Sequence, residues 1–200
     1  MHEYDSATAL IVVDLQNDFA DPDGSLSVPR GDAIIPTING EIEAATEAEA
    51  LVVYTQDWHP PSTPHFAKDG GVWPDHCVQD TWGAELHPDL RLQGPVVRKG
   101  ANGEDGYSGF TMRHPVGGET IPTELERLLR DRGIERVIVC GLATDYCVKA
   151  TALDAARLGF ATSVLAEAIG AVDLEPGDGA RALTELRAAD VEIIGTAAVG

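Results

Sequence analysis

The chain has 200 residues, of which 44% are hydrophobic, and 14 lysines and arginines stand against 33 aspartates and glutamates for a formal net charge of -19. This length suits one globular domain over residues 1–200, because a single core can grow to about 250 residues before chains divide. The negative charge repels nucleic acid and anionic lipid surfaces, so we exclude both as main partners. The excess acid is expected to coat the helices as a solvated face.

The sequence predicts a cytoplasmic protein. No apolar stretch approaches the ~20 residues needed to span a bilayer, and residues 1–5 lack the basic start of a secretory signal. Three cysteines without an export signal favour free thiols in a reducing compartment. Whether copies of the chain form a homo-oligomer is left open.

Six short apolar runs rich in β-branched residues are typical of strands buried on both faces of a parallel sheet. They cover residues 8–13, 50–55, 95–98, 136–140, 161–165 and 191–194. Apolar residues at helical spacing occupy four of the connections, at residues 34–45, 125–129, 148–158 and 182–186. This alternation predicts a three-layer α/β/α domain with right-handed crossovers. Gly133 and Gly159 lie where two of the helices should end.

One connection is too long for a simple crossover. Residues 57–95 are rich in proline and glycine, and loops of this length in a compact domain are usually functional or disordered. The histidines and tryptophans of this segment argue against disorder. We therefore expect a functional loop.

Three polar side chains follow strand-like runs that lie far apart in the sequence. Asp14 follows the first run, Lys99 the third and Cys147 the fourth. Because the carboxyl ends of neighbouring parallel strands converge on one crevice, these residues can share a pocket. We interpret them as the candidate catalytic residues of a hydrolase.

Cys147 is predicted between a strand and the next helix. Free backbone N–H groups and the helix dipole at such a position lower the pKa of a thiol and favour a nucleophile. The same N–H groups could hold an oxyanion. A free cysteine taken alone is more often a small core residue, and we assign that role to Cys77 and Cys140.

Asp14 and Lys99 each allow a second interpretation. A partly desolvated carboxylate has a raised pKa and can exchange a proton with a thiol, but Asp14 could equally cap a helix. Lys99 is one of only three lysines. It could pair with Asp14 in the pocket, or it could lie in solvent.

The long loop also offers a set of metal ligands. Asp57, His59 and His76 supply one oxygen and two nitrogen donors, a set that suits Zn²⁺, Mn²⁺ or Fe²⁺. Asp57 and His59 point the same way in an extended segment because they are two residues apart. His65 is either a fourth ligand or a group that hydrogen-bonds one. His2, His87 and His114 are interpreted as ordinary surface or core residues.

These stretches, taken in order, carry a resemblance to a known family. They are Asp14-Leu15-Gln16-Asn17-Asp18-Phe19 with Gly24-Ser25-Leu26, Asp57-Trp58-His59-Pro60, Trp73-Pro74-Asp75-His76-Cys77-Val78, Lys99-Gly100 with Tyr107-Ser108-Gly109-Phe110, and Gly141-Leu142-Ala143-Thr144-Asp145-Tyr146-Cys147-Val148. Each motif is weak alone, but together they cover most of residues 8–165. The chain resembles the nicotinamidase/pyrazinamidase family of the isochorismatase-like cysteine hydrolases.

The resemblance implies a six-stranded parallel sheet in the order 3-2-1-4-5-6. It implies the following site residues: a catalytic triad of Asp14, Lys99 and Cys147; metal ligands Asp57, His59 and His76, with His65 as a further ligand in some members; Phe19 and Trp73 beside the substrate ring; and a cis peptide before Ala143 that aims the Ala143 and Cys147 amides at the oxyanion. His65 lies six residues after His59, a spacing found in only part of the family.

The function implied is a nicotinamidase that needs one divalent transition metal (Zn, Fe or Mn) and hydrolyses nicotinamide, and also pyrazinamide, through a cysteine thioester. One alternative is a metal-independent isochorismatase-like hydrolase of another small amide or a vinyl ether. A second alternative is a non-catalytic module that binds a metal or ligand. The complete Asp-His-His set argues against the first alternative, and the complete triad against the second.

Overall fold

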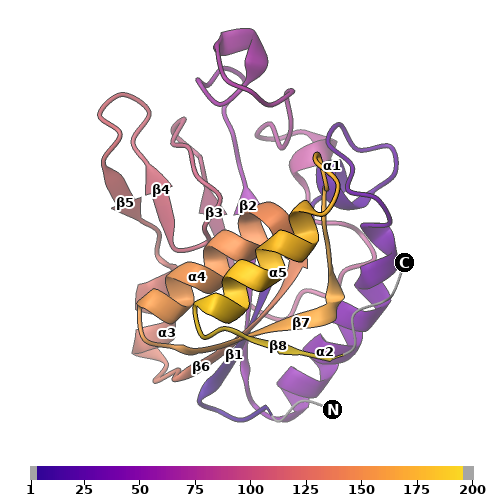
Figure 1. Cartoon of the computed structure of the whole chain (residues 1–200), viewed down its shortest axis with the longest axis vertical. Helices are drawn as coiled ribbons and strands as arrows, with labels where there is room; N and C mark the ends of the chain where they lie inside the picture. Colours follow the sequence, from indigo (N-terminus) through magenta and orange to yellow (C-terminus); the bar gives the residue numbers. More distant parts are fainter. Residues whose placement is uncertain (1–3, 196–200) are drawn as a thin grey trace.

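A six-stranded parallel sheet forms the centre of the computed structural model, which describes residues 4–195 (Figure 1). Its strands are β1 (Thr8–Val13), β2 (Leu51–Asp57), β3 (Val96–Lys99), β6 (Arg136–Leu142), β7 (Ala161–Gly170) and β8 (Glu192–Ile194). They lie in the order β3-β2-β1-β6-β7-β8, and every neighbouring pair is parallel. Counted along the chain, this is the predicted order 3-2-1-4-5-6, which is confirmed.

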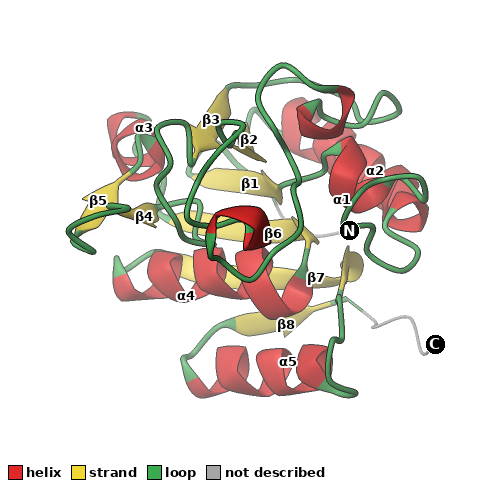
Figure 2. Cartoon of the chain, turned by 90° about the horizontal axis from the view of Figure 1, so that it is seen from above, coloured by secondary structure: helices red, strands yellow, loops and turns green. Residues whose placement is uncertain are grey.

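Helices cover both faces of the sheet, as the three-layer prediction requires. They are α1 (Asn17–Ala20), α2 (Ile35–Glu47), α3 (Leu125–Asp131), α4 (Lys149–Arg157) and α5 (Asp178–Ala188). Alternate residues of β1 point to opposite faces, so Leu10 packs with Ile38 of α2, whereas Ile11 packs with Leu129 of α3. Figure 2 shows α2 on one side of the sheet and α4 and α5 on the other.

Two glycines end helices where the sequence predicts. Gly133 has φ 67° and Gly159 has φ 85°, the left-handed backbone that glycine adopts without a steric penalty. Beyond each glycine the chain closes back on its helix, since Ile134 N–H donates to the carbonyl of Leu129 at 3.1 Å. This is the hydrogen bond expected after a C-terminal glycine.

Some elements differ from the sequence prediction. The strand predicted at 161–165 continues to Gly170, and a π-helical turn, Thr144–Val148, precedes α4. A hairpin of β4 (Thr111–Arg113) and β5 (Thr120–Pro122) was not predicted, because three-residue strands are too short to show a period.

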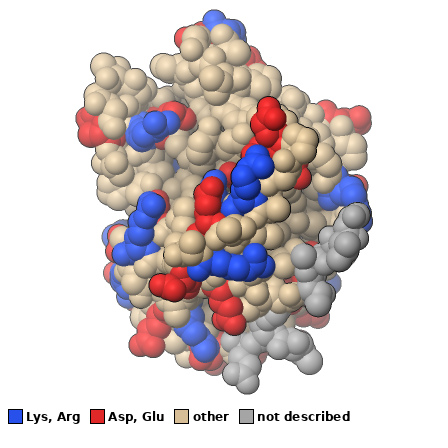
Figure 3. Space-filling model, viewed as in Figure 1, with Lys and Arg blue, Asp and Glu red and all other residues tan. Residues whose placement is uncertain are grey.

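Charged side chains of both signs are interspersed on the face that α4 and α5 cover (Figure 3). Lys149 pairs with Glu185 at 2.9 Å, and Arg157 pairs with Asp154 at 3.2 Å. Within residues 4–195, no helix is both long and apolar enough to cross a membrane. Against this solvated surface, a lysine with 1% exposure, Lys99, needs an explanation.

Candidate functional site

The carboxyl ends of four strands bring together the three residues that we predicted as catalytic and one that we predicted as a metal ligand. Asp14 directly follows β1, Asp57 ends β2 and Lys99 ends β3. Asp57 and Lys99 are register partners in adjacent strands. Cys147 comes from the turn after β6, the other neighbour of β1. The sheet therefore converts four distant sequence positions into one cluster.

Lys99 is the centre of this cluster. Its Nζ lies 3.0 Å from Asp14 Oδ2, donates to Asp57 Oδ1 and lies 3.7 Å from Cys147 Sγ. The carboxylates of Asp14 and Asp57 and the sulfur of Cys147 lie within 4.8 Å of one another. One buried cation is thus shared by two carboxylates and a thiol.

The pKa values of the two carboxyl groups that share Lys99 shift in opposite directions. Burial favours the neutral form of both, but Lys99 and the nearby histidines hold the pKa of Asp57 well below its usual range. Burial raises the pKa of Asp14, and the Lys99 ammonium offsets only part of that effect. Asp14 is therefore the carboxyl group that can accept and return a proton.

Cys147 rests as a thiol. Burial raises its pKa well above the ordinary value, and Lys99 acts in the opposite direction. The pKa of Lys99 is itself well above its ordinary value, because Asp14 and Asp57 outweigh the effect of burial. A thiol of this kind needs a base beside it to become a nucleophile, and Asp14 is in that position.

Two polar residues that we did not predict hold the carboxylates in place. Thr55 Oγ1 donates to Asp14 Oδ1 at 2.6 Å. Gln16 binds the backbone of Asp57 in both directions, accepting from its N–H at 2.8 Å and donating to its carbonyl at 2.6 Å. Thr55 lies two residues before Asp57 on β2, so the strand period was a usable signal for it.

The peptide bond between Leu142 and Ala143 is cis, as the resemblance implied. Ala143 immediately precedes the π-helical turn that carries Cys147. Both amides therefore belong to the amino-terminal end of a helical segment, where N–H groups are available to an anion. The assignment of the oxyanion site to Ala143 and Cys147 stays a prediction.

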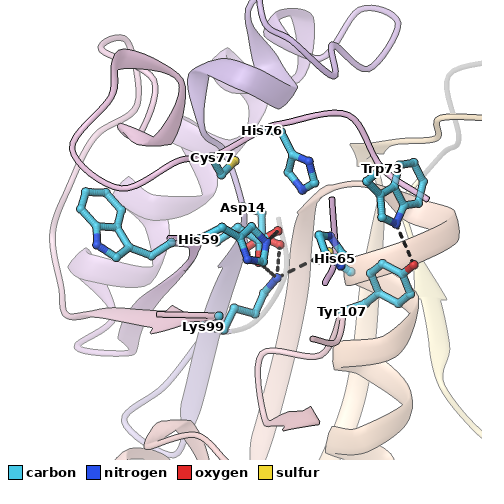
Figure 4. A network of polar contacts seen from close by, with 12 residues as sticks. Asp14, His59, His65, Trp73, His76, Cys77, Lys99 and Tyr107 are labelled. Atoms are coloured by element: carbon cyan, nitrogen blue, oxygen red, sulfur yellow. Dashed lines mark hydrogen bonds and ion pairs between the residues drawn. The ribbon is translucent and has the colours of Figure 1, made fainter. Parts of the chain in front are cut away.

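Three histidines of the long loop form a second cluster beside the first. One ring nitrogen from each of His59, His65 and His76 lies within 4.8 Å of the others. His59 Nε2 is 3.8 Å from Asp57 Oδ2, so Asp57 faces Lys99 with one oxygen and the imidazoles with the other. Figure 4 shows the labelled imidazoles grouped above the Lys99 ammonium.

The donors of this cluster fit a transition metal. Both ring nitrogens of His59 are buried and have no hydrogen-bond partner among the described residues. Burial lowers the pKa of His76 to about 4, so its ring is neutral near pH 7. Its Nδ1 lies 2.8 Å from the Pro74 carbonyl, so that nitrogen carries the hydrogen and Nε2 keeps a lone pair. Neutral imidazoles with free lone pairs are the form that binds Zn²⁺, Fe²⁺ or Mn²⁺.

A pocket opens onto both clusters, and Asp57, His65, His76 and Cys147 are among its lining residues. The predicted substrate-binding residues Phe19, Trp73 and Ala143 line it, together with Cys147. The walls are mostly apolar, so the pocket suits a flat, largely apolar ring.

Two tyrosines complete this wall. Tyr146 packs edge-on against Trp73 at 5.1 Å between ring centroids, and the Trp73 indole N–H donates to the Tyr107 hydroxyl at 3.1 Å (Figure 4). Neither tyrosine was predicted to have a role, although both lie in the motifs that carry the resemblance. Their contribution appears only when the loop and the turn are packed together.

The other candidates lie outside the two clusters. Cys140 is in β6 and Cys77 is buried in the core, as predicted. His87 is buried and accepts the Asp89 N–H, whereas His114 lies at the surface. His2 lies outside the described residues.

The fold and these clusters define a class: an α/β hydrolase with a cysteine nucleophile at the carboxyl edge of a parallel sheet. The isochorismatase domain model matches residues 8–198. A nicotinamidase of Escherichia coli (strain K12) is 41% identical over 90% of this chain and 91% of its own.

Solved structures agree with this match. Pyrazinamidase of Pyrococcus horikoshii in complex with zinc has a TM-score of 0.84 and 43% identity over 95% of this chain and 99% of its own. PnC1 from L. infantum in complex with nicotinate has a TM-score of 0.85 and 38% identity over 96% of this chain and 95% of its own. The chain belongs to the isochorismatase family, in its nicotinamidase/pyrazinamidase group.

Proposed function

We propose that the protein is a metal-dependent nicotinamidase, which hydrolyses nicotinamide to nicotinate and ammonia and also accepts pyrazinamide. The observation that carries the proposal is the shared pocket, in which a thiol, an aromatic wall and a cluster of metal-binding imidazoles face the same space. The thiol supplies the nucleophile, the aromatic wall holds a flat ring, and the imidazoles distinguish this site from that of a metal-independent hydrolase.

The first half of the reaction forms a thioester. Asp14 takes the proton of the Cys147 thiol, and the sulfur attacks the amide carbon. Lys99, 3.7 Å from the sulfur, stabilises the thiolate while the proton is on Asp14. The Ala143 and Cys147 amides stabilise the oxyanion. Asp14 then returns its proton to the nitrogen, and the C–N bond breaks to release ammonia.

The second half regenerates the enzyme. Asp14, again unprotonated, takes a proton from a water molecule as that water attacks the thioester carbon. The C–S bond breaks, Asp14 returns this proton to the sulfur, and the nicotinic acid formed loses its carboxyl proton to solvent to become nicotinate. One water is consumed for each ammonia released, and Asp14 ends in its starting state.

A metal would be held by Asp57, His59 and His76, with His65 as the fourth protein ligand. A divalent transition ion bound there would supply a Lewis acid beside the pocket that holds the ring. Holding the substrate amide against the sulfur can lower the barrier by several kcal/mol, and by about 7 to 11 kcal/mol where the groups are well oriented. Phe19 and Trp73 bind the two sides of the ring.

The test is ammonia release from nicotinamide and pyrazinamide, before and after chelation. We expect activity in the purified protein, its loss on chelation, and its return with Zn²⁺, Fe²⁺ or Mn²⁺ added singly. An aliphatic amide of similar size serves as the control and should react much more slowly. Full activity after verified metal removal would support the metal-independent alternative instead.

A further inference from the structure

His65 is the one imidazole of the cluster whose ring is held by a carboxylate. Its Nδ1 lies 2.7 Å from Asp105 Oδ1, and the His65 side chain is 6% exposed. His76 uses a backbone carbonyl for the same purpose, and His59 has no hydrogen-bond partner within the described part of the chain. Asp105 was not among the residues singled out from the sequence.

The carboxylate determines which nitrogen of His65 is free. An aspartate is ionised near neutral pH and can only accept a hydrogen bond, so His65 Nδ1 carries the hydrogen. The lone pair then lies on Nε2. The ring stacks on that of His59 with 4.7 Å between centroids and meets that of His76 edge-on at 5.3 Å. Nε2 is therefore the donor that His65 offers to the cluster.

Asp105 is itself held by the hairpin. Its backbone forms two hydrogen bonds with Arg113 at the end of β4, and the Arg113 guanidinium binds its second oxygen, Oδ2. The Gly106 N–H donates to Oδ1 at 2.8 Å. Both oxygens of the Asp105 carboxylate thus have partners. Oδ1 binds the His65 ring and the Gly106 N–H, and Oδ2 binds Arg113.

We propose that Asp105 is a positioning residue which makes His65 a direct metal ligand, with Arg113 holding Asp105 in place. Partners of this kind fix the tautomer and direction of a ligating imidazole and raise its basicity. The chain of contacts runs from the β4–β5 hairpin through Arg113 and Asp105 to His65. It gives a physical reason for a fourth ligand six residues after His59.

The test measures Zn²⁺ affinity of the full-length protein by competition with a chromophoric chelator. Asp105→Asn should weaken Zn²⁺ binding about 10- to 100-fold, the usual effect of losing the partner of a ligating histidine. Arg113→Ala should weaken it less, because Asp105 keeps its contact with His65. Glu104→Gln is the matched control, since Glu104 is the neighbouring buried carboxylate but binds Asn102 rather than a histidine.

A double-mutant comparison separates this role from a general effect on structure. In a His65→Ala background, Asp105→Asn should cause no further loss of Zn²⁺ affinity. The visible spectrum of the Co²⁺-loaded protein should change in Asp105→Asn and should not change in Glu104→Gln. Wild-type Zn²⁺ affinity in Asp105→Asn, or an equal loss in both backgrounds, would overturn the proposal.

The inference rests on the metal site of the proposed function, but its measurement does not use turnover. Tight Zn²⁺ binding that depends on Asp105, in a protein that does not hydrolyse nicotinamide, would overturn the proposed function and leave this inference standing. Nicotinamide hydrolysis with a metal affinity independent of Asp105 would do the reverse.

Discussion

The two buried polar clusters at the carboxyl edge of the sheet differ in the groups that they bring together. Around Lys99, one cation lies among two carboxylates and a thiol, so the charges compensate each other inside the protein. Around His59, three imidazoles lie together, and both nitrogens of His59 have no partner among the described residues. The first cluster thus contains its own cation, whereas the second offers nitrogen lone pairs to a metal.

Asp57 joins the two clusters. One oxygen faces Lys99 and the other faces His59. Removing a partner from the Lys99 cluster should therefore change the chemistry, and removing one from the imidazole cluster should change metal affinity.

The largest expected effect is on the nucleophile. Cys147→Ala should reduce nicotinamide turnover by about 10⁴-fold or more, because no other group can form the thioester. Fold and metal content should be unchanged, as seen by circular dichroism and elemental analysis. Cys140→Ala is the control and should keep its activity, since Cys140 lies within β6. Near-normal turnover in Cys147→Ala would contradict the assignment.

The base should have the next largest effect. Asp14→Asn keeps the shape of the side chain but cannot take the thiol proton, so turnover should fall by about 10²- to 10⁴-fold with ligand binding retained. Lys99→Met should also reduce turnover, and the two losses should not multiply in the double variant. Lys149→Met, at a surface ion pair with Glu185, serves as the control. Ammonia release and calorimetric binding of nicotinamide provide the measurements.

The imidazole cluster should control metal content. The wild-type protein should hold about one transition metal per chain, and His59→Ala should weaken Zn²⁺ binding more than the 10- to 100-fold expected for a residue that only orients a ligand. His87→Asn is the matched control, because it lies outside the cluster and keeps an acceptor for the Asp89 N–H. Elemental analysis after dialysis distinguishes the two variants. Retention of a full equivalent of metal by His59→Ala would contradict the site.

The smallest effect is on stability against pH. The pKa of His76 is lowered by burial to about 4, whereas an unfolded histidine titrates near 6.5. Between about pH 4 and pH 6.5, His76 is therefore protonated in the unfolded chain but neutral in the folded chain. For the metal-free protein, this contribution is fully present above pH 6.5 and is lost as the pH falls to 4, by up to about 3 kcal/mol of unfolding free energy.

His76→Gln should remove that part of the pH dependence. Denaturant unfolding of the metal-free wild type and variant at several pH values between 4 and 7 gives the comparison, and His114→Gln, at the surface, is the control. Identical pH profiles for wild type and His76→Gln would show that His76 is not the group responsible.

Much of the fold and of the Lys99 cluster could be predicted from the sequence. Continuous apolar runs such as that of β1 indicated a parallel sheet, and the rule that ligands bind at the carboxyl ends of parallel strands placed Asp14, Lys99 and Cys147 in one pocket. The resemblance supplied the strand order and the family, and both are confirmed. These features are accessible because periodicity and motif order are local properties of a chain.

Only the tertiary structure shows which ion-pair and hydrogen-bond partners the residues of the two clusters have. The β2–β3 register places Asp57 beside Lys99, while its other oxygen faces His59. The packing of the hairpin places Asp105 against His65, which is 40 residues away in the sequence. Such pairings depend on strand register and on how loops pack, neither of which leaves a period in the sequence. The sequence thus indicates candidate catalytic residues by their type and position, whereas the tertiary structure determines which carboxyl group has a raised pKa and which imidazoles lie together.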